Sequence, residues 1–325
     1  MKYFITALML LTFTSLYAGS RVQFFIGDVK HQTPGSSAWG KISNNQILRT
    51  GDTIITGKKS QVMIDSDGNM IKILPETKVR ITQDMINDRQ QSSLALFKGV
   101  VNCKINKLGK KNPGYNVNTA ATTCAVRGTD FDVYAGADGK TILQVTDGTV
   151  ALSGNTKTID VQKDYESSVS VGGEPEPVRI IKRRDWEKWA EETKSDVAGR
   201  EKDIIKGCLT KVKKLDEDII RLEKDGAEAK LKADEYHKLA KEAKEANDKN
   251  KASEYISIYQ KEKLKAYSSN IKASYQTTRI DLVKDVSDNA YNSIKNKNNI
   301  QKEYDLIIQI REKHYNKYIK PFIKK

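Results

Sequence analysis

Short runs in which apolar and polar residues alternate fill the chain from about residue 22 to residue 171. Alternation with a period of two turns every second side chain to one face of a β-strand. Glycine-containing corners separate these runs, and no strict repeat length emerges. The pattern predicts an all-β region arranged as an irregular solenoid or a sandwich. The inward-facing residues expected in its first half are Val62, Ile64, Met70 or Ile71, Ile73, Val79 and Ile81.

The pattern changes after residue 181. Residues 178–320 contain no proline, and apolar or small residues recur there in alternating steps of three and four. One such stripe spans residues 198–243, and a second spans residues 255–294 after a polar turn. Heptad spacing on two consecutive segments is typical of paired helices. The sequence therefore predicts an α-helical coiled-coil hairpin within residues 182–325, with antiparallel long helices and a further short helix.

Between these two regions, residues 172–181 begin with the run G-G-E-P-E-P. Glycine loosens the backbone, and proline disfavours both helix and paired strand. The segment is therefore predicted to be a linker. The expected fold class is α+β and multidomain, with an N-terminal all-β domain at residues 21–171 followed by the helical region.

The first twenty residues have the features of a secretory signal peptide. Lys2 precedes an apolar stretch, and small residues follow at Ala18, Gly19 and Ser20. Such segments are removed after small residues, so cleavage is expected after Ala18 or Ser20. An uncleaved membrane anchor is the alternative. Because no cysteine lies beside the cleavage site, a lipid-modified N-terminus is not expected, and the mature protein is expected in the periplasm.

Residues 117–133, V-N-T-A-A-T-T-C-A-V-R-G-T-D-F-D-V, resemble the hallmark of the FecR-domain family. Further pieces follow that family's order, including L-R-T-G-D-T-I-I-T-G at residues 48–57. The resemblance spans roughly residues 25–171 and implies a β-solenoid-like FecR domain, preferred here to a plain sandwich. The residues that carry the family motif are Gly51, Asp52, Gly99, Arg127, Gly128, Thr129, Phe131 and Gly148.

The chain has three cysteines, of which Cys103 and Cys124 lie in predicted strands and Cys208 lies on the first helical stripe. Cys103 and Cys124 both share a strand face with apolar neighbours, so both are expected to point inward. A disulfide between them would close a loop of about 20 residues and contribute on the order of 3 kcal/mol. We hypothesise this bond; two separate buried thiols are the alternative.

The sequence contains no recognised catalytic or metal-binding motif. The three histidines, His31, His237 and His314, are widely spaced and fit no zinc pattern, so each is expected at the surface. The run at residues 65–69, D-S-D-G-N, departs from a calcium loop and is better explained as a hairpin corner on Asp67-Gly68. No enzymatic activity, metal or cofactor is expected.

The chain carries a formal net charge of +14. From Lys295 onward, nine basic residues face three acidic ones, with Tyr304, Tyr315 and Tyr318 among them. Basic and aromatic residues together suit nucleic acid, but export separates the protein from it. The expected partner is therefore an envelope protein or an anionic envelope polymer, and contact of the basic C-terminus with a membrane surface is also compatible. A merely solvated basic face is the alternative.

The FecR resemblance implies sensing or binding at the envelope. The familiar members of that family control a sigma factor, but this sequence shows neither their cytoplasmic domain nor their later module, so that activity is not carried over. The sequence favours a non-enzymatic periplasmic binding or scaffold protein whose FecR domain recognises an envelope partner and whose helical arm serves assembly. The alternative is a component of an envelope signal-sensing pathway that acts through a separate transmembrane regulator.

Overall fold

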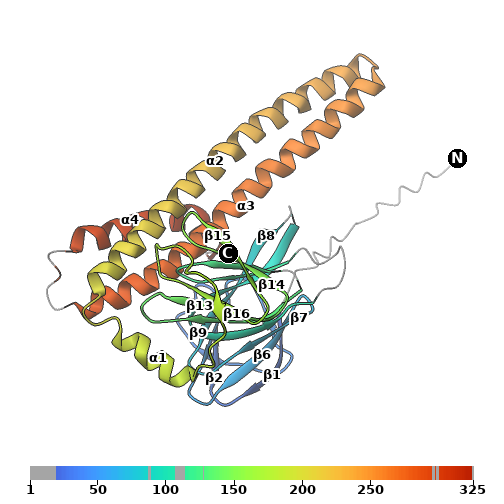
Figure 1. The fold of residues 1–325 in the computed structure, drawn as a ribbon. Coiled ribbons are helices and arrows are strands. Elements are labelled where there is room, and N and C mark those ends of the chain that lie inside the picture. Colours follow the sequence, from blue (N-terminus) through green and yellow to red (C-terminus); the bar gives the residue numbers. More distant parts are fainter. Residues whose placement is uncertain are drawn as a thin grey trace.

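The computed structural model describes residues 20–86, 89–106, 114–126, 128–294, 297 and 300–323 (Figure 1). In this part of the chain, strands occupy the region up to Ile180 and helices begin at Trp186. The α+β fold class with β first and helices second is confirmed. The predicted signal peptide lies outside the described residues, apart from Ser20.

The strands form two sheets that share the long strand β9 (Arg89–Lys104). Sheet A has the order β4-β1-β6-β7-β9-β12-β13-β16-β17, and sheet B has the order β3-β2-β5-β8-β9-β10-β11-β14-β15. The other strands of sheet A are β1 (Ser20–Ile26), β4 (Ile47–Leu48), β6 (Gln61–Ser66), β7 (Asn69–Ile73), β12 (Asp130–Ala135), β13 (Thr141–Asp147), β16 (Tyr165–Val169) and β17 (Arg179–Ile180). Those of sheet B are β2 (Val29–Gln32), β3 (Gly40–Lys41), β5 (Thr53–Thr56), β8 (Lys78–Ile86), β10 (Tyr115–Asn118), β11 (Thr123–Val126), β14 (Thr149–Ser153) and β15 (Thr158–Gln162).

Strand β9 passes from one sheet to the other at Gly99. Before Gly99 the strand pairs with β8, and after it the strand pairs with β7. Gly99 has φ +107°, and a Cβ there would lie 2.5 Å from the Cα of Thr77. Only glycine tolerates both conditions. Hairpins thus alternate between two facing sheets along the chain. The solenoid-like fold that the family resemblance implies stays a prediction.

The alternating residues identified in the sequence fill the space between the sheets. Val62, Ile64, Ile73 and Val79 are fully buried. The choice between Met70 and Ile71 is settled by the register, which pairs Ile71 with Ile64 and leaves Met70 half-buried. Each such aliphatic side chain contributes about 1.5–3 kcal/mol on burial. The hairpin corner predicted on Asp67-Gly68 is confirmed, with both residues at positive φ.

Five helices follow the strands in the described residues: α1 (Trp186–Ser195), α2 (Glu201–Glu245), α3 (Lys249–Ser293), α4 (Gln301–Tyr318) and α5 (Lys320–Ile323). Helices α2 and α3 are antiparallel and meet at Asn247, which has φ +60°. Asp248 caps α3 by accepting a hydrogen bond from the backbone N of Lys251 at 3.1 Å. Gly226 lets the two helices approach closely at Ser269. The predicted hairpin is therefore confirmed, with α4 as the further helix.

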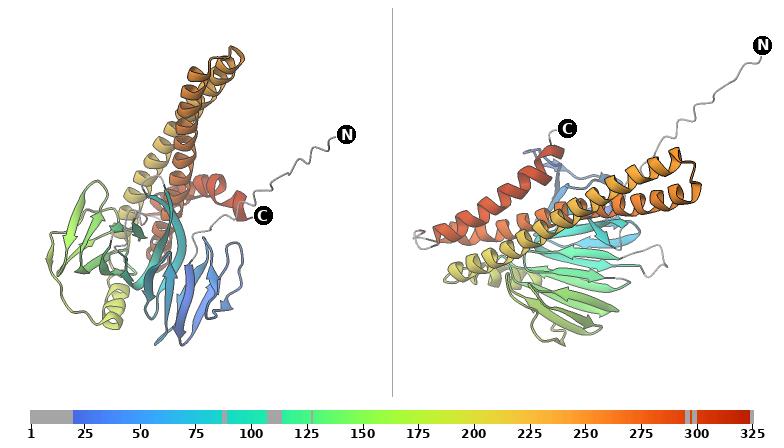
Figure 2. Two further views of the ribbon diagram at one scale, coloured as in Figure 1. Left: turned by 90° about the vertical axis from the view of Figure 1, so that its right-hand side faces the viewer. Right: turned by 90° about the horizontal axis from the view of Figure 1, so that it is seen from above.

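The near half of the hairpin packs on the β domain, whereas its far half projects away from it (Figures 1 and 2). Phe97 and Ala95, from the outer face of sheet B, are buried in one apolar cluster with Ile280 and Val283 of α3. The seam residues of α2 join the same cluster; they are Ile205, Cys208, Val212, Leu215 and Ile219. The domain and the arm therefore share a core at the root of the arm.

The segment predicted as a linker, residues 172–181, is packed rather than loose. It contains β17, which follows the last proline of the segment, Pro177, and pairs with β16. The carboxylate of Glu174 accepts hydrogen bonds from the backbone N of Thr156 and of Lys157, both at 2.9 Å. Gly172 crosses α2 at Gly207, so closely that a Cβ on Gly172 would lie 2.9 Å from the Gly207 Cα. Two glycines on separate segments allow this backbone contact, which the composition of the segment alone does not reveal.

The prediction that all three histidines lie at the surface is wrong for His314. Its side chain is 1% exposed, and its Nε2 lies 2.6 Å from Asp216 Oδ1 of α2. His31 is also largely buried and lies 3.3 Å from Asp52. Because α4 packs back against α2, a residue in a polar stretch of sequence becomes interior; only His237 is exposed as expected.

A candidate ligand-binding cleft between the sheet and the helices

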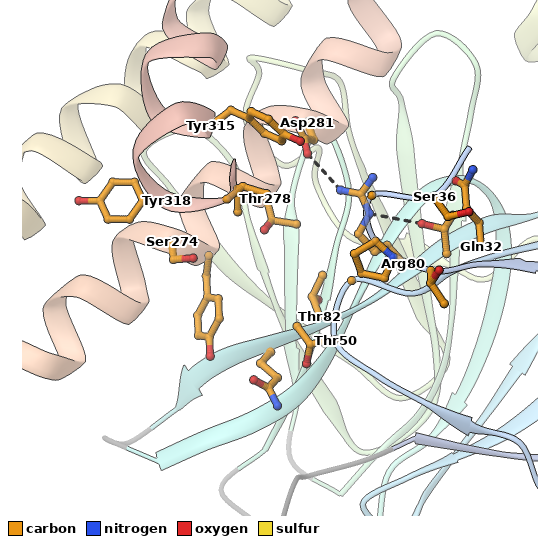
Figure 3. A pocket seen from close by; sticks show the side chains of 18 of the residues that line it. Gln32, Ser36, Thr50, Arg80, Thr82, Ser274, Thr278, Asp281, Tyr315 and Tyr318 are labelled. Carbon is orange, nitrogen blue, oxygen red and sulfur yellow. Dashed lines mark hydrogen bonds and ion pairs between the residues drawn. The ribbon is translucent and has the colours of Figure 1, made fainter. Parts of the chain in front are cut away.

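A cleft of about 400 Å³ opens where the β domain meets α3 and α4. One wall comes from the loop after β2, from residues 50–53 and from β8, and the other comes from α3 and the end of α4 (Figure 3). The volume lies within the range of small-molecule sites, about 300–1,000 Å³. The cleft is therefore large enough for a ligand of one or two rings, and it is built from both regions of the chain.

Arg80 of β8 and Arg311 of α4 share the carboxylate of Asp281 at the centre of the cleft. Nη1 of Arg80 lies 3.0 Å from Asp281 Oδ2, and Nε of Arg311 lies 2.9 Å from Asp281 Oδ1. Figure 3 shows Arg80 between Asp281 and the loop that carries Gln32 and Ser36. Because two guanidinium groups share one carboxylate, the centre of the cleft carries an excess positive charge.

A second ion pair continues this contact away from the cleft. Lys78 Nζ lies 2.7 Å from Asp285 Oδ1, one helical turn after Asp281. Residues two apart on a strand share a face, as do residues four apart on a helix. The pairs Lys78–Asp285 and Arg80–Asp281 therefore align β8 with α3 and fix the width of the cleft.

Hydroxyl groups line most of the remaining surface of the cleft. A hydroxyl both donates and accepts hydrogen bonds, and its rotation adapts to the ligand. Thr82 already bonds Ser93 at 2.8 Å, and Thr53 lies 3.4 Å from the Nε of Arg80. Among the described residues, the seven non-aromatic hydroxyl side chains of the lining are Thr33, Ser36, Thr50, Thr53, Thr82, Ser274 and Thr278.

Tyrosine rings add flat surfaces to this polar lining. The guanidinium of Arg311 stacks on Tyr315, 3.8 Å from the ring centroid. The hydroxyl of Tyr318 donates to Glu223 Oε1 of α2 at 2.7 Å, which holds its ring at the edge of the cleft. The basic and aromatic C-terminal segment noted in the sequence thus supplies a wall of the cleft. Aromatic faces of this kind stack on apolar faces of ring-shaped ligands.

One of the predicted motif residues, Gly51, lines the cleft directly. It has φ +94°, and a Cβ there would lie 2.5 Å from Pro34 Cγ. Asp52 lies behind it, 3% exposed, and accepts a hydrogen bond from the backbone N of Arg49 at 2.8 Å. The L-R-T-G-D-T segment therefore shapes this wall of the cleft through a tight turn.

The other motif residues support the fold at places outside the cleft lining. Gly128 and Gly148 have φ of +70° and +85°, as turns between strands require. Thr129 and Phe131 are buried, and Thr129 O accepts a hydrogen bond from Ile105 N at 2.9 Å. Arg127 lies outside the described residues. The motif thus identifies the domain but includes only one residue of the cleft lining, Gly51. Arg80, Asp281 and Arg311 belong to no motif and to no apolar repeat that the sequence analysis could have used to find them.

All three cysteines are buried free thiols in the structure, so the hypothesised bond between Cys103 and Cys124 is not present. Cys103 lies on sheet A and Cys124 on sheet B, both facing the core as expected. Burial raises the pKa of Cys103, and it raises the pKa of Cys124 to about 12. Both behave as small apolar core residues, which is the alternative weighed for them.

We expect thiol titration without reductant to detect three thiols in the unfolded protein and none readily in the folded protein. Cys208 is fully buried at the root of the arm, so it is shielded from a second chain. The measurement is reaction with an aromatic disulfide reagent in the presence and absence of denaturant. One thiol per unfolded chain would instead indicate the Cys103–Cys124 bond, and a dimer abolished by Cys208→Ser would contradict the intramolecular hairpin.

Among the described residues, no three His, Cys, Asp or Glu side chains are grouped so that they could hold a metal ion. No helix in the same part of the chain combines the length and apolarity needed to cross a bilayer. What the cleft offers is hydrogen bonding, one excess positive charge and aromatic faces. This arrangement suits reversible binding of a polar ligand.

Comparison with known protein families agrees with the motif. Residues 52–151 match the family described as FecR protein, so the chain contains a FecR domain. No curated protein matches the chain.

Two crystal structures of a candidate anti-sigma factor from Parabacteroides distasonis are similar to part of the chain. The one at 1.65 Å resolution is 16% identical, with a TM-score of 0.34, over 42% of this chain and 63% of that one. The one at 2.50 Å is 17% identical, also with a TM-score of 0.34, over 42% of this chain and 62% of that one. The chain thus spans less than two thirds of either protein.

Proposed function

We propose that the protein is an exported, non-enzymatic binding protein that holds a polyhydroxylated envelope ligand, a segment of a glycan, in the cleft between its FecR domain and its helical arm. The observation that carries this proposal is the lining: seven non-aromatic hydroxyls, three tyrosine rings and a shared Arg–Asp–Arg group surround one cavity. Sugars present alternating hydroxyls and apolar ring faces, which these groups complement. The basic centre fits the anionic envelope polymer expected from the charge of the chain.

Export to the periplasm is part of this proposal and rests on the N-terminal segment. Of the two expected cleavage positions, the one after Ala18 fits the fold better. Ser20 opens β1, is buried, and donates its hydroxyl hydrogen bond to Ser66 Oγ at 3.0 Å. Cleavage after Ser20 would remove that contact. We therefore favour a mature N-terminus at Gly19, which sequencing of the native protein from its N-terminus tests.

The binding experiment is calorimetric titration of the full chain with fragments of the cell's own envelope polysaccharide. We expect Thr50→Val and Thr278→Val together to weaken binding about thirtyfold, since each lost hydrogen bond contributes roughly 1 kcal/mol. Valine matches threonine in shape, so the cleft keeps its form. The control is Thr149→Val on β14, an exposed threonine outside the cleft lining. Unchanged affinity in the double variant, or equal loss in the control, contradicts a site in the cleft.

A second candidate function is a component of an envelope signal-sensing pathway that acts through a separate transmembrane regulator. The FecR domain favours it, because that domain is characteristic of signal-transduction regulators. In this version the cleft receives the signal and the arm contacts the regulator. Photo-crosslinking from exposed positions on the far half of the arm, such as Leu231, tests it in intact cells. Capture of a membrane-spanning regulator supports signalling, and capture of envelope structural proteins alone supports a scaffold.

A further inference from the structure

A second, smaller cavity of about 180 Å³ adjoins the cleft beneath α3. It lies between α3 and the outer face of sheet B, and we call it the inner cavity. It shares four lining residues with the cleft, so only those side chains separate the two spaces. They are Thr82, Gln83, Tyr275 and Thr278. A ligand in the cleft is therefore within reach of the inner cavity.

Arg279 of α3 lines the inner cavity and lacks a full set of partners. Its Nη1 donates to Gln276 Oε1 at 2.9 Å. Its Nε is buried and has no hydrogen-bond acceptor among the described residues. No described carboxylate lies within 4.0 Å of the Arg279 guanidinium, and the carboxylate of Asp281 pairs with Arg80 and Arg311. Burial lowers the pKa of Arg279, and the more distant Asp84 and Asp218 offset this only in part. A buried cationic N–H without an acceptor is costly, and an anion would satisfy it.

A second buried cation faces the same region from α2. Lys211 is 3% exposed, and its Nζ donates to the carbonyl O of Gly154 at 3.2 Å. Burial and then repulsion from Arg279 lower the pKa of Lys211 to about 7. Lys211 therefore lies outside the described lining of the inner cavity, but close enough to Arg279 for their charges to repel each other.

Among the described residues that line the inner cavity, Asp84 is the one acidic side chain, and its carboxylate already accepts two hydrogen bonds. Its Oδ2 accepts from Asn116 Nδ2 at 2.6 Å, and its Oδ1 accepts from Met85 N at 2.8 Å. Burial raises the pKa of Asp84, and the hydrogen bonds from Asn116 and Met85 oppose this shift. The remaining polar walls are amides and hydroxyls, including Asn118, Gln83 and Thr123. The inner cavity therefore holds a buried guanidinium whose Nε–H has no acceptor among the described residues.

We propose that the inner cavity binds the oxyanion of an acidic saccharide, a carboxylate or a phosphate, while the neutral sugar ring lies in the cleft. This inference rests on the proposed function and adds that the bound saccharide carries an acidic group. The anion accepts the unpaired Nε–H of Arg279 and relieves its repulsion with Lys211. The amides of the wall donate the remaining hydrogen bonds that an oxyanion requires.

The test compares three probes on the full chain by nuclear magnetic resonance titration: glucose, glucuronate and glucose 1-phosphate. We expect at least one acidic probe to bind about tenfold more tightly than glucose, as one charge-assisted hydrogen bond gives. Arg279→Gln should abolish this preference and leave the affinity for glucose unchanged. Arg279→Lys, which keeps the charge, should restore part of it. The matched control is Arg221→Gln on α2, where the side chain is 67% exposed and pairs with Asp218.

The outcomes separate this inference from the proposed function. Equal affinity of the wild-type protein for all three probes overturns the oxyanion site but leaves a neutral sugar site in the cleft. If neither the three probes nor the polysaccharide fragments bind, the oxyanion site and the proposed function are both overturned. Preference for glucuronate assigns a carboxylate, and preference for glucose 1-phosphate assigns a phosphate. Since the comparison of probes needs only the wild-type chain, it decides the question even where Arg279→Gln does not fold.

Discussion

Gly99→Ala is expected to lower the free energy of unfolding by about 3–5 kcal/mol, the sum of an overpacking cost and a positive-φ cost. The new Cβ would lie 2.5 Å from the Cα of Thr77, where real Cβ atoms are not found. Thr77 cannot yield, because its Oγ1 accepts from Val100 N at 3.0 Å and its backbone N donates to Thr56 Oγ1 at 2.9 Å. The measurement is urea-induced unfolding followed by circular dichroism.

Gly68→Ala provides a matched control for this prediction. Gly68 also has positive φ, +81°, but a Cβ there meets no atom within 4 Å. It should therefore show the conformational cost alone, about 1–2 kcal/mol. The difference between the two variants isolates the clash at the point where β9 changes sheets. If both variants lose the same stability, the crossing at Gly99 is not as tight as described.

Glu166→Gln is expected to destabilise the protein by about 3 kcal/mol at neutral pH, near the lower end of the cost of breaking a buried ion pair. Glu166 is fully buried and accepts from Arg184 Nη1 at 2.5 Å, Arg179 Nε at 2.8 Å and Gln144 Nε2 at 2.7 Å. Removing its charge leaves two guanidinium groups uncompensated. Both reach solvent in part, which keeps the cost below that of a wholly buried pair.

The same residue predicts how stability depends on pH. Burial alone would raise the pKa of Glu166, but hydrogen bonds from Arg184, Gln144 and Arg179 outweigh it and lower the pKa from 4.5 to about 2. A lowered folded-state pKa stabilises the fold fully above about pH 4.5, and this contribution is lost as the pH falls towards about 2. The gap in stability between wild type and Glu166→Gln should therefore narrow over this range.

Glu191→Gln, which removes an exposed partner of Lys194, is the control and should change the stability of the protein little at any pH. A gap that persists unchanged to pH 2 would show that the effect is not electrostatic.

The parts of the fold that follow from local periodicity were predictable. Alternation placed Val62, Ile64 and Ile73 in the core, because a period of two fixes the face of every residue once one face is buried. Heptad steps similarly placed Ile205 and Val212 on the seam of the hairpin. These patterns are dictated by burial of apolar surface, which each element shows in its own sequence.

The contacts between the two regions were not predictable in this way. Arg80 and Asp281 are 201 residues apart, and polar residues that meet across an interface leave no periodic trace. The packed course of the supposed linker depends on Gly172 meeting Gly207, a contact between segments that only the assembled fold defines. Of the family motif, Gly51 alone reached the cleft lining. The cleft and the inner cavity both arise from the docking of the arm on the sheet.

The length of the arm gives its docking a mechanical consequence. Helices α2 and α3 have 45 residues each, so each is about 68 Å long, and only their near halves touch the β domain. The hairpin is therefore held at one end only, by contacts that include the crossing of Gly172 and Gly207 and the Arg80–Asp281 pair. Because the cleft lies at this docked end, a small change in the angle between α3 and the sheet would displace the tip of the arm several times farther than the residues that line the cleft.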